Sequence, residues 1–289
     1  MQVWNRAQKK LTQEPEVGLG AMHFAYETAL GRFLTKAILC RKPISNLYGA
    51  VQRSRLTRGK VRRFMKEYRI SVDDCTKQEF SSFNDFFTRH IRPELRPLPQ
   101  DPACLSAPCD GRLSAYHLEE TGVFDIKGSR YDVRALLGGD PRAALFAGGD
   151  CLVFRLCVDD YHRYHYIDDG EKGENVFIPG RLHTVRPIAL EHTNVFIQNC
   201  REYTLMQTRH FGTVAQIEVG ALLVGRVCNH DGAGAFTRGA EKGCFYYGGS
   251  TVVLLLQKGR ATVDERFFAA TRRGEETRVL LGQRLDCLP

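Results

Sequence analysis

The sequence lacks any run of eighteen apolar residues, so we expect no membrane-spanning helix. Its first ten residues are polar and lack the apolar core of a secretory signal. Ten cysteines are present, but no two are spaced as Cys-x-x-Cys, so the usual signature of a zinc or thioredoxin-type site is missing. We therefore expect reduced, scattered thiols and no bound metal.

Internal repeats and low-complexity tracts are also missing. The 289 residues are 43% hydrophobic and 26% charged, which is typical of a globular protein with a large core. The charge is unevenly spread. Residues 1–70 hold fifteen Lys and Arg against four Glu, whereas residues 71–289 hold twenty-six Lys and Arg against twenty-nine Asp and Glu. The basic first quarter predicts a partner of opposite charge, either nucleic acid or anionic lipid.

Helical spacing of apolar residues predicts a helix over residues 22–39 and one or two more over residues 45–69. Eight Arg and Lys stand between Arg53 and Arg69, both included. A basic amphipathic helix can lie on an anionic membrane, or it can pack its apolar stripe on a core and leave its charges in water. Another short helix is predicted over residues 80–90, before a proline-rich connector.

From about residue 105 the sequence predicts strands, because short apolar runs alternate with glycine-rich turns. The predicted strands cover residues 151–158, 194–197, 214–227 and 251–257. We therefore expect an α+β fold, with N-terminal amphipathic helices before a mostly antiparallel β catalytic domain of sandwich or barrel-like form. The expected division is a basic helical, membrane-associating region, residues 1–95, and a β-rich domain, residues 96–289.

Three short strings combine residue types that carry chemistry. Residues 107–111 read as a turn that contains Asp110. Residues 159–165 place His162 and His165 beside acids and an arginine, although each histidine can equally be structural and no third metal ligand of matching spacing accompanies them. Residues 219–225 read as a strand in which glycines permit close backbone approach.

The string at residues 242–251 is the most informative. Gly248 and Gly249 lead directly into Ser250 and Thr251, and an apolar run follows. Glycine permits backbone conformations that other residues cannot hold, which leaves the Gly249 carbonyl open to attack by the Ser250 hydroxyl. Taken alone, such a string is more often a tight turn before a strand.

Together these strings resemble the phosphatidylserine decarboxylase family, because many short strings stand in that family's order between residues 83 and 260. They are Phe83-Asn84-Asp85-Phe86-Phe87-Thr88-Arg89, Arg96-Pro97-Leu98, Pro108-Cys109-Asp110-Gly111, Lys127-Gly128-Ser129-Arg130-Tyr131, Asp160-Tyr161-His162-Arg163-Tyr164-His165, Asn199-Cys200-Arg201, Glu218-Val219-Gly220-Ala221, Lys242-Gly243 and Gly248-Gly249-Ser250-Thr251. Gly248 stands where the best-known form of the cleavage motif has Leu. The Gly-Gly-Ser-Thr form is also familiar in the family, so the departure weakens only inferences about subtype.

The resemblance implies that the chain cuts itself between Gly249 and Ser250, into residues 1–249 and 250–289. Carried onto this sequence, Asp110, His165 and Ser250 form the self-cleaving arrangement. His165 takes the proton from Ser250, and Asp110 holds His165 in the right tautomer. The Ser250 hydroxyl attacks the Gly249 carbonyl, and Ser250 becomes a covalent pyruvoyl cofactor.

The pyruvoyl group is an electron sink. By resemblance it forms an imine with phosphatidylserine, and loss of CO2 then gives phosphatidylethanolamine. The family ties the histidine at the position of His162 to decarboxylation, as a general acid or carbanion stabiliser, although it can instead be a residue that only orients the site. The family also implies paired large and small subunits and a homodimer.

The expected partner of the basic helices is therefore phosphatidylserine in an anionic membrane, and not nucleic acid. Missing targeting signals suit a peripheral enzyme on the cytoplasmic face of a bacterial plasma membrane. Two alternatives remain. One is a pyruvoyl-dependent decarboxylase of the same family with a different amino-acid or lipid substrate. The other is a non-enzymatic basic module that binds nucleic acid or membrane.

Overall fold

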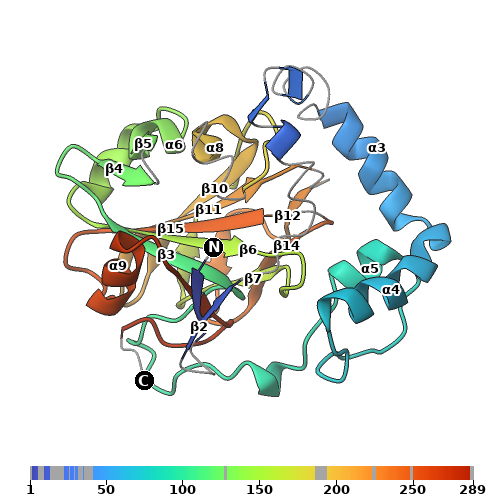
Figure 1. Cartoon of the computed structure of the whole chain (residues 1–289). Coiled ribbons are helices and arrows are strands. Elements are labelled where there is room, and N and C mark those ends of the chain that lie inside the picture. Colours follow the sequence, from blue (N-terminus) through green and yellow to red (C-terminus); the bar gives the residue numbers. More distant parts are fainter. Residues whose placement is uncertain are drawn as a thin grey trace.

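The structure, a computed structural model, describes most of the chain from residue 42 onward and short stretches before it. The described residues are 2–5, 10–13, 23–25, 27–28, 30–31, 35, 42–126, 129–185, 194–222, 226–247 and 250–286. In Figure 1 a twisted sheet occupies the centre of the molecule, and a group of helices lies to one side of it. Among the described residues, no helix is both long enough and apolar enough to cross a lipid bilayer.

The helices beside the sheet are α3 (Lys42–Arg53), the 3-10 helix η2 (Arg55–Thr57), α4 (Arg58–Tyr68) and α5 (Phe83–Phe87). Helices thus form where the sequence predicts them over residues 45–69 and 80–90. Most of the helix predicted over residues 22–39 lies outside the described residues. The end of α4 is set by Arg69, whose left-handed φ of 53° stops the helix and lets its N–H bond the Met65 carbonyl.

Aromatic rings hold α4 and α5 together. Phe64 of α4 meets Phe83 and Phe86 of α5 edge to face, with ring centroids 5.0 and 6.0 Å apart. We call α3, η2, α4 and α5 the helical group. Its buried apolar residues are Val61, Phe80, Phe83, Phe86 and Phe87. The apolar side of α4 therefore packs inward against protein.

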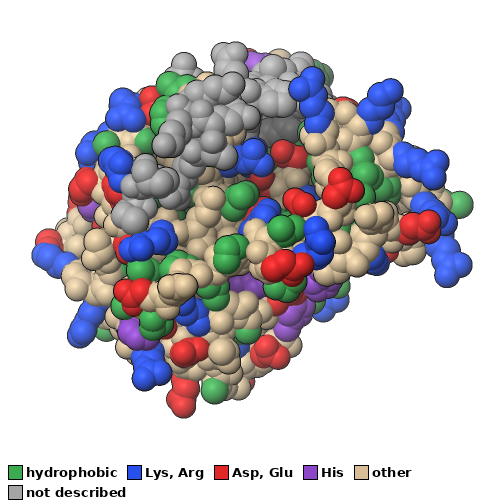
Figure 2. Space-filling model, turned by 90° about the horizontal axis from the view of Figure 1, so that it is seen from below, with side chains coloured by type: hydrophobic (Ala, Val, Ile, Leu, Met, Phe, Trp, Pro, Cys, Tyr) green, Lys and Arg blue, Asp and Glu red, His purple; other side chains and the backbone are tan. Residues whose placement is uncertain are grey.

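The outer surface of this helical group combines apolar and basic side chains. Leu47 and Val51 of α3 are exposed, and Leu56 of η2 is 93% exposed. Figure 2 shows Lys and Arg side chains along the outer edge of the helical group, at the right of the view. Exposed apolar residues beside cations are typical of a surface that binds something.

The central sheet contains eleven strands. They are β1 (Gln2–Asn5), β2 (Lys10–Gln13), β3 (Gly111–His117), β6 (Asp150–Leu156), β8 (Gly170–Lys172), β9 (Val176–Ile178), β10 (Arg201–Thr208), β11 (Gly212–Gly220), β13 (Gly234–Phe236), β15 (Ser250–Leu256) and β16 (Glu276–Val279). Their order is β13-β8-β10-β11-β15-β6-β3-β16-β1-β2, and β9 also pairs with β10. The pairs are antiparallel except that of β1 with β16.

Two smaller sheets and several short helices surround the central sheet. One small sheet contains β12 (Val227–Asn229), β14 (Glu241–Phe245) and β7 (Arg163–His165), and the other contains β4 (Val123–Ile126) and β5 (Ser129–Asp132). The remaining helices are η3 (Pro93–Leu95), α6 (Val133–Leu136), η4 (Pro141–Phe146), α8 (Val195–Gln198) and α9 (Glu265–Arg272).

The predicted strands meet different outcomes. β6 and β15 lie within the predicted ranges 151–158 and 251–257 to within one residue. The strand predicted over residues 214–227 ends early, because β11 stops at Gly220, and residues 223–225 lie outside the described part. The strand predicted over residues 194–197 is wrong, because α8 forms there. An apolar run of four residues has too little periodicity to separate a strand from a helical turn.

The expected barrel-like closure is also wrong. Closure requires the outermost strands to pair with each other. Among the described strands, β13 pairs only with β8 and β2 only with β1, so the sheet keeps two open edges. The fold is therefore a mixture of helix and strand in which an open, mostly antiparallel sheet dominates.

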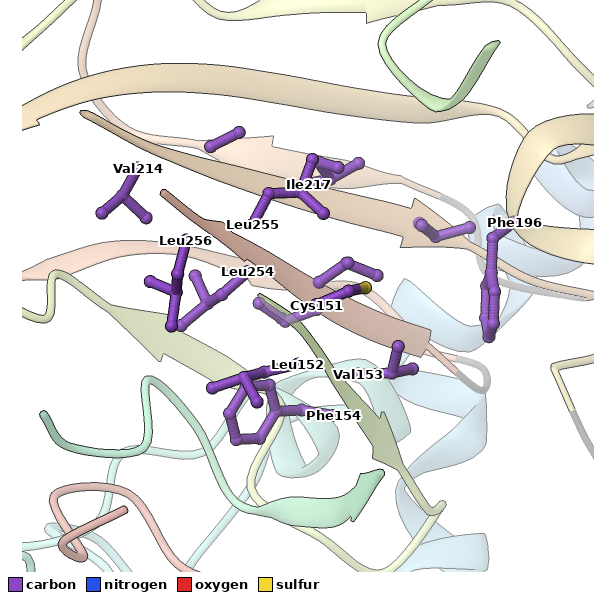
Figure 3. Packing of buried hydrophobic residues seen from close by; sticks show 14 of the residues in the cluster. Cys151, Leu152, Val153, Phe154, Phe196, Val214, Ile217, Leu254, Leu255 and Leu256 are labelled. Atoms are coloured by element: carbon purple, nitrogen blue, oxygen red, sulfur yellow. The ribbon is translucent and has the colours of Figure 1, made fainter. Parts of the chain in front are cut away.

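The main core is packed around β15. All seven residues of this strand are buried, as are six of the seven in β6. Continuous burial of this kind is expected for a strand that is covered on both faces. Figure 3 shows side chains of β6, β11 and β15 gathered in this core. Ser250 thus begins the most deeply buried strand of the molecule.

Candidate active site

Ser250 lies where three strands of the central sheet meet. Its backbone is in register with Leu156 at the end of β6 and with Gly220 at the end of β11. Its side chain is fully buried, and its Oγ has no hydrogen-bond partner in the described part of the chain. A buried hydroxyl without a partner costs free energy, so its retention points to a functional role. Gly248 and Gly249 lie outside the described residues.

The chain around Ser250 is closely packed. A Cβ atom on Gly220 would lie 3.3 Å from both the Cys200 carbonyl oxygen and a methyl carbon of Leu182. This confirms the close backbone approach predicted for the strand that contains Gly220. Thr251, which follows Ser250, is also fully buried, and its hydroxyl has no partner within the described residues.

His165 ends β7 and is held through one ring nitrogen. Its Nδ1 lies 2.9 Å from the Gly239 carbonyl oxygen. Because a carbonyl can only accept, Nδ1 carries the proton and Nε2 carries the lone pair. Nε2 is buried without a partner among the described residues. Burial lowers the pKa of His165, against a smaller opposing effect of the Gly239 carbonyl. The ring is therefore neutral near pH 7, with Nε2 able to act as a base.

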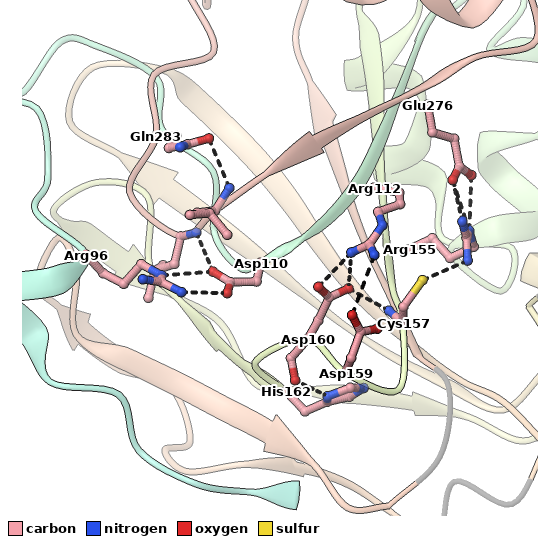
Figure 4. A network of polar contacts seen from close by, with 12 residues as sticks. Arg96, Asp110, Arg112, Arg155, Cys157, Asp159, Asp160, His162, Glu276 and Gln283 are labelled. Atoms are coloured by element: carbon pink, nitrogen blue, oxygen red, sulfur yellow. Dashed lines mark hydrogen bonds and ion pairs between the residues drawn. The ribbon is translucent and has the colours of Figure 1, made fainter. Parts of the chain in front are cut away.

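Asp110 lies directly before β3, and its carboxylate is bound by groups other than His165. Arg96 donates from Nε to Oδ1 over 3.2 Å and from Nη2 to Oδ2 over 2.9 Å, and the Leu281 N–H donates to Oδ1 over 2.8 Å (Figure 4). Residues 107–111 and 159–165 nevertheless lie side by side, because the His165 N–H donates to the Pro108 carbonyl over 2.8 Å. Burial lowers the His165 pKa, and the charges of Glu241 and, to a smaller extent, Asp110 raise it.

His162 lies in the connection between β6 and β7 and is fully buried. Its ring packs on Phe87 of α5, with ring centroids 3.9 Å apart. Its Nδ1 donates to the Asp160 carbonyl over 3.0 Å, so Nε2 again carries the lone pair, and it has no partner in the described residues. Burial lowers the pKa of His162 to about 3. This ring is therefore also neutral near pH 7.

A buried ion pair fixes the connection that carries His162. Arg112 Nη1 lies 2.6 Å from each carboxylate oxygen of Asp160, which also accepts from the Cys157 N–H over 2.7 Å (Figure 4). Arg89, which follows α5, donates to the carbonyl oxygens of Asp159 and Asp160 over 2.9 and 3.1 Å. The connection is thus held from β3 on one side and from the helical group on the other.

A second buried ion pair joins the three-stranded sheet to the central sheet. Lys242 of β14 lies with its Nζ 2.8 Å from Glu218 Oε1 of β11 and 2.7 Å from Asn229 Oδ1, and both charged side chains are fully buried. Burial raises the pKa of Glu218, and Lys242 opposes that effect. A Cβ on Gly243 would lie 2.3 Å from the Cys228 carbonyl oxygen, so only glycine fits after Lys242.

The predicted site residues are therefore brought together in part. In the described part of the chain, no hydrogen bond joins Asp110, His165 and Ser250 to one another. The sequence analysis missed the roles of Arg96 and Gly239. Arg96 belongs to a string that the resemblance included, so its charge was a usable signal, whereas Gly239 acts through a backbone carbonyl that any residue carries.

A family profile and several known proteins resemble this chain. A family profile described as "Phosphatidylserine decarboxylase" matches residues 83–285. The chain is 38% identical over 283 residues to phosphatidylserine decarboxylase proenzyme 2 of Clostridium acetobutylicum, covering 98% of this chain and 97% of that relative. It is 35% identical over 288 residues to the phosphatidylserine decarboxylase proenzyme of Clostridium perfringens, covering 98% of both chains. The proenzyme of Clostridium novyi is 36% identical over 290 residues, covering 99% of this chain and 98% of that relative.

Proposed function

The chain belongs to the phosphatidylserine decarboxylase family, and we propose that it removes the headgroup carboxylate of phosphatidylserine as CO2 and releases phosphatidylethanolamine. The protein is thus a decarboxylase, a carboxy-lyase, and the non-enzymatic basic module is set aside. A family member with another amino-acid or lipid substrate remains the alternative.

One observation carries the mechanism. Ser250 Oγ, His162 Nε2 and His165 Nε2 are all buried polar atoms without a hydrogen-bond partner among the described residues. Native proteins keep few such atoms, because each costs free energy. A nucleophile and two neutral bases with free lone pairs are what self-cleavage and proton transfer require.

Self-cleavage begins at Ser250. His165 Nε2 takes the hydroxyl proton, and Oγ attacks the Gly249 carbonyl carbon, so that the peptide bond is replaced by an ester and the nitrogen gains a proton. Loss of the Cα proton then expels the Gly249 carboxylate and leaves dehydroalanine at position 250. Water converts this residue to a pyruvoyl group with release of ammonia. The products are residues 1–249 and 250–289.

Asp110 supports this step through its charge. A carboxylate near His165 stabilises the imidazolium that forms when Nε2 takes the proton. Gly239 keeps the proton on Nδ1, which leaves Nε2 free for Ser250. Arg96 in turn fixes the Asp110 carboxylate through both of its oxygens. The tautomer is therefore set by the backbone, and the charge is supplied by the acid.

The residues around position 250 fit a pyruvoyl group, because the site is buried and the Thr251 hydroxyl has no partner within the described residues. Such a group supplies an electron sink for decarboxylation. We assign to His162 the return of a proton to the carbon that loses CO2. Because the ring is neutral near pH 7, Nε2, which the bond from Nδ1 to the Asp160 carbonyl leaves free, must first take up a proton, and its depressed pKa then favours giving that proton to the carbon.

We place the enzyme at the surface of an anionic membrane, on the cytoplasmic face of a bacterial plasma membrane. Support comes from the exposed Leu47, Val51 and Leu56 beside the basic surface of α3 and α4. Phosphatidylserine itself carries the net negative charge that such a surface attracts. The division at residues 95 and 96 and the homodimer remain predictions.

The test is to compare the wild type with Ser250→Ala by intact mass and by CO2 release. Wild-type protein should yield fragments of 249 and 40 residues, the smaller without a free amine, and should act on phosphatidylserine vesicles but not on free serine. Ser250→Ala should stay whole and inactive. Active full-length protein with an ordinary serine at position 250 would contradict the mechanism, and activity on free serine alone would favour the alternative substrate.

A further inference from the structure

The helical group contacts the chain just before the proposed cleavage site, and Asn84 makes a hydrogen bond there to the backbone. Asn84 Oδ1 accepts the Tyr247 backbone N–H over 3.1 Å, and Asn84 is buried. Tyr247 stands two residues before Gly249, whereas Asn84 belongs to α5, 163 residues away in sequence. This bond is therefore a tertiary attachment between the helical group and the strand connection that enters β15.

The helix that carries Asn84 is itself firmly attached. Ser82 caps α5 by accepting the Asp85 N–H over 3.1 Å, and the Phe83 N–H donates to the Thr57 hydroxyl over 3.0 Å. After the helix, the Thr88 carbonyl accepts two bonds from Arg163, which stands next to His162. Asn84 is thus presented by a short helix that is fixed at both ends.

Tyr247 is held by its ring as well as by its backbone. The ring centroid lies 4.8 Å from that of Phe83 and 5.0 Å from that of Phe87, and both contacts are edge to face. The Tyr48 ring of α3 also contacts the Tyr247 ring, with ring centroids 5.7 Å apart. Tyr247 is therefore fixed relative to α5 in two ways, by the hydrogen bond of its N–H and by the packing of its ring.

Ser250 is fixed equally well on the other side of the glycine pair. It is paired in register with both Leu156 and Gly220, at the start of a strand that is buried along its whole length. The chain is therefore anchored at Tyr247 and again at Ser250. Both described residues that flank the glycine pair are therefore fixed in place.

We propose that Asn84 is a positioning residue for self-cleavage, which rests on the proposed function. By fixing Tyr247, it anchors the chain two residues before Gly249, and so limits the freedom of the segment that must present a carbonyl to Ser250. An intramolecular attack depends steeply on such geometry, and a misplacement of about 1 Å costs on the order of 100-fold in rate. Loss of the Asn84 bond should therefore slow maturation by about 10- to 100-fold without removing any group that reacts.

The experiment follows maturation of the full chain in a cell-free translation reaction, by gel and intact mass at fixed times. Asn84→Leu keeps the size of the side chain but has no acceptor, and it should slow cleavage by at least about 10-fold. Asn84→Asp keeps an oxygen at the same place and should recover most of the rate. Ser82→Ala is the matched control, because it removes the cap of α5 and leaves the Asn84 acceptor in place.

If Asn84 served only to stabilise the fold, Asn84→Leu and Ser82→Ala would slow maturation equally at the same loss of stability. We expect Ser82→Ala to mature within about threefold of the wild type even where its melting temperature falls as far as that of Asn84→Leu. The pH at half-maximal cleavage rate should be the same in Asn84→Leu and the wild type, because geometry is changed and His165 is not. Equal slowing of both variants at matched melting temperature, or failure of Asn84→Asp to recover the rate, would overturn the proposal.

The two proposals fail in different ways. Ser250→Ala that still matures would remove the proposed function itself. Ser250→Ala that stays whole, together with Asn84→Leu that matures at the wild-type rate, would remove only the role of Asn84.

Discussion

The helical group and the sheet handle their positive charges in opposite ways. On α4, Arg62, Arg63 and Lys66 are exposed to water. In the sheet, Arg112 and Lys242 are buried against Asp160 and Glu218. Exposed cations are free to meet an outside anionic surface, whereas buried cations fix the geometry of the protein that contains them. The same residue types are thus exposed to water in one region and fixed in buried ion pairs in the other.

Removing one member of a buried pair should break this contrast most strongly. Glu218→Gln leaves Lys242 charged and fully buried beside only neutral partners. The free energy of unfolding should fall by about 3–5 kcal/mol in chemical denaturation. Lys258→Met, which removes an exposed pair with Glu120, is the control and should cost about 0–1 kcal/mol. A Glu218→Gln effect no larger than that of the control would show that burial of this pair is unimportant.

Low pH should lower the free energy of unfolding by protonating His162, which packs on Phe87 where the helical group meets the β-rich part. The folded pKa of His162, about 3, is below that of the unfolded chain, about 6.5, so the unfolded state binds the extra proton between these values. Stability from the neutral ring is full above pH 6.5 and falls as pH drops toward 3. The loss is up to about 1.4 kcal/mol per pH unit. Unfolding measured against pH should show a shallower acid slope in His162→Gln, and equal slopes would contradict this account.

The smallest expected effect of a single residue concerns the exposed cations. Replacing Arg62, Arg63 and Lys66 with Gln should weaken binding to phosphatidylserine-containing vesicles by about 1 kcal/mol per residue, or about fivefold each at low salt. The matched control replaces three exposed cations of the β-rich part with Gln, namely Lys258, Arg260 and Arg272. Cosedimentation should separate the two triple variants. Equal losses would mean that the vesicle surface senses only net charge.

Much of the fold could be predicted from the sequence because its apolar patterns are long. The buried run in β15 and the helical spacing in α4 each span enough residues to fix the element type. α8 was not readable, because residues 195–198 give one apolar turn that fits either period. The open sheet edges were not readable either. Pairing of β2 and β13 with a single neighbour depends on long-range contacts that no local pattern encodes.

The candidate site divides along a similar line. The side chains to which we assign chemical roles, Ser250, His162 and His165, were found in the sequence through the strings that contain them. Supporting groups did not, because the Gly239 carbonyl belongs to the backbone and Asn84 acts on an amide far away in sequence. The pairing of Asp110 with Arg96 was not predicted either, since the two residues stand fourteen positions apart in the sequence. Support of a site is a property of the folded chain.

The position of β15 determines how residues 1–249 and 250–289 could separate after cleavage. This strand is bonded over seven residue pairs to β11 and over seven to β6, and β16 further along the same fragment pairs with β3. Two polypeptides joined in this way share one interior, so separating them and melting them are a single event. Maturation would then be a one-way step in the life of the molecule: once melted, the halves have no peptide bond to guide the strand back to the middle of its sheet.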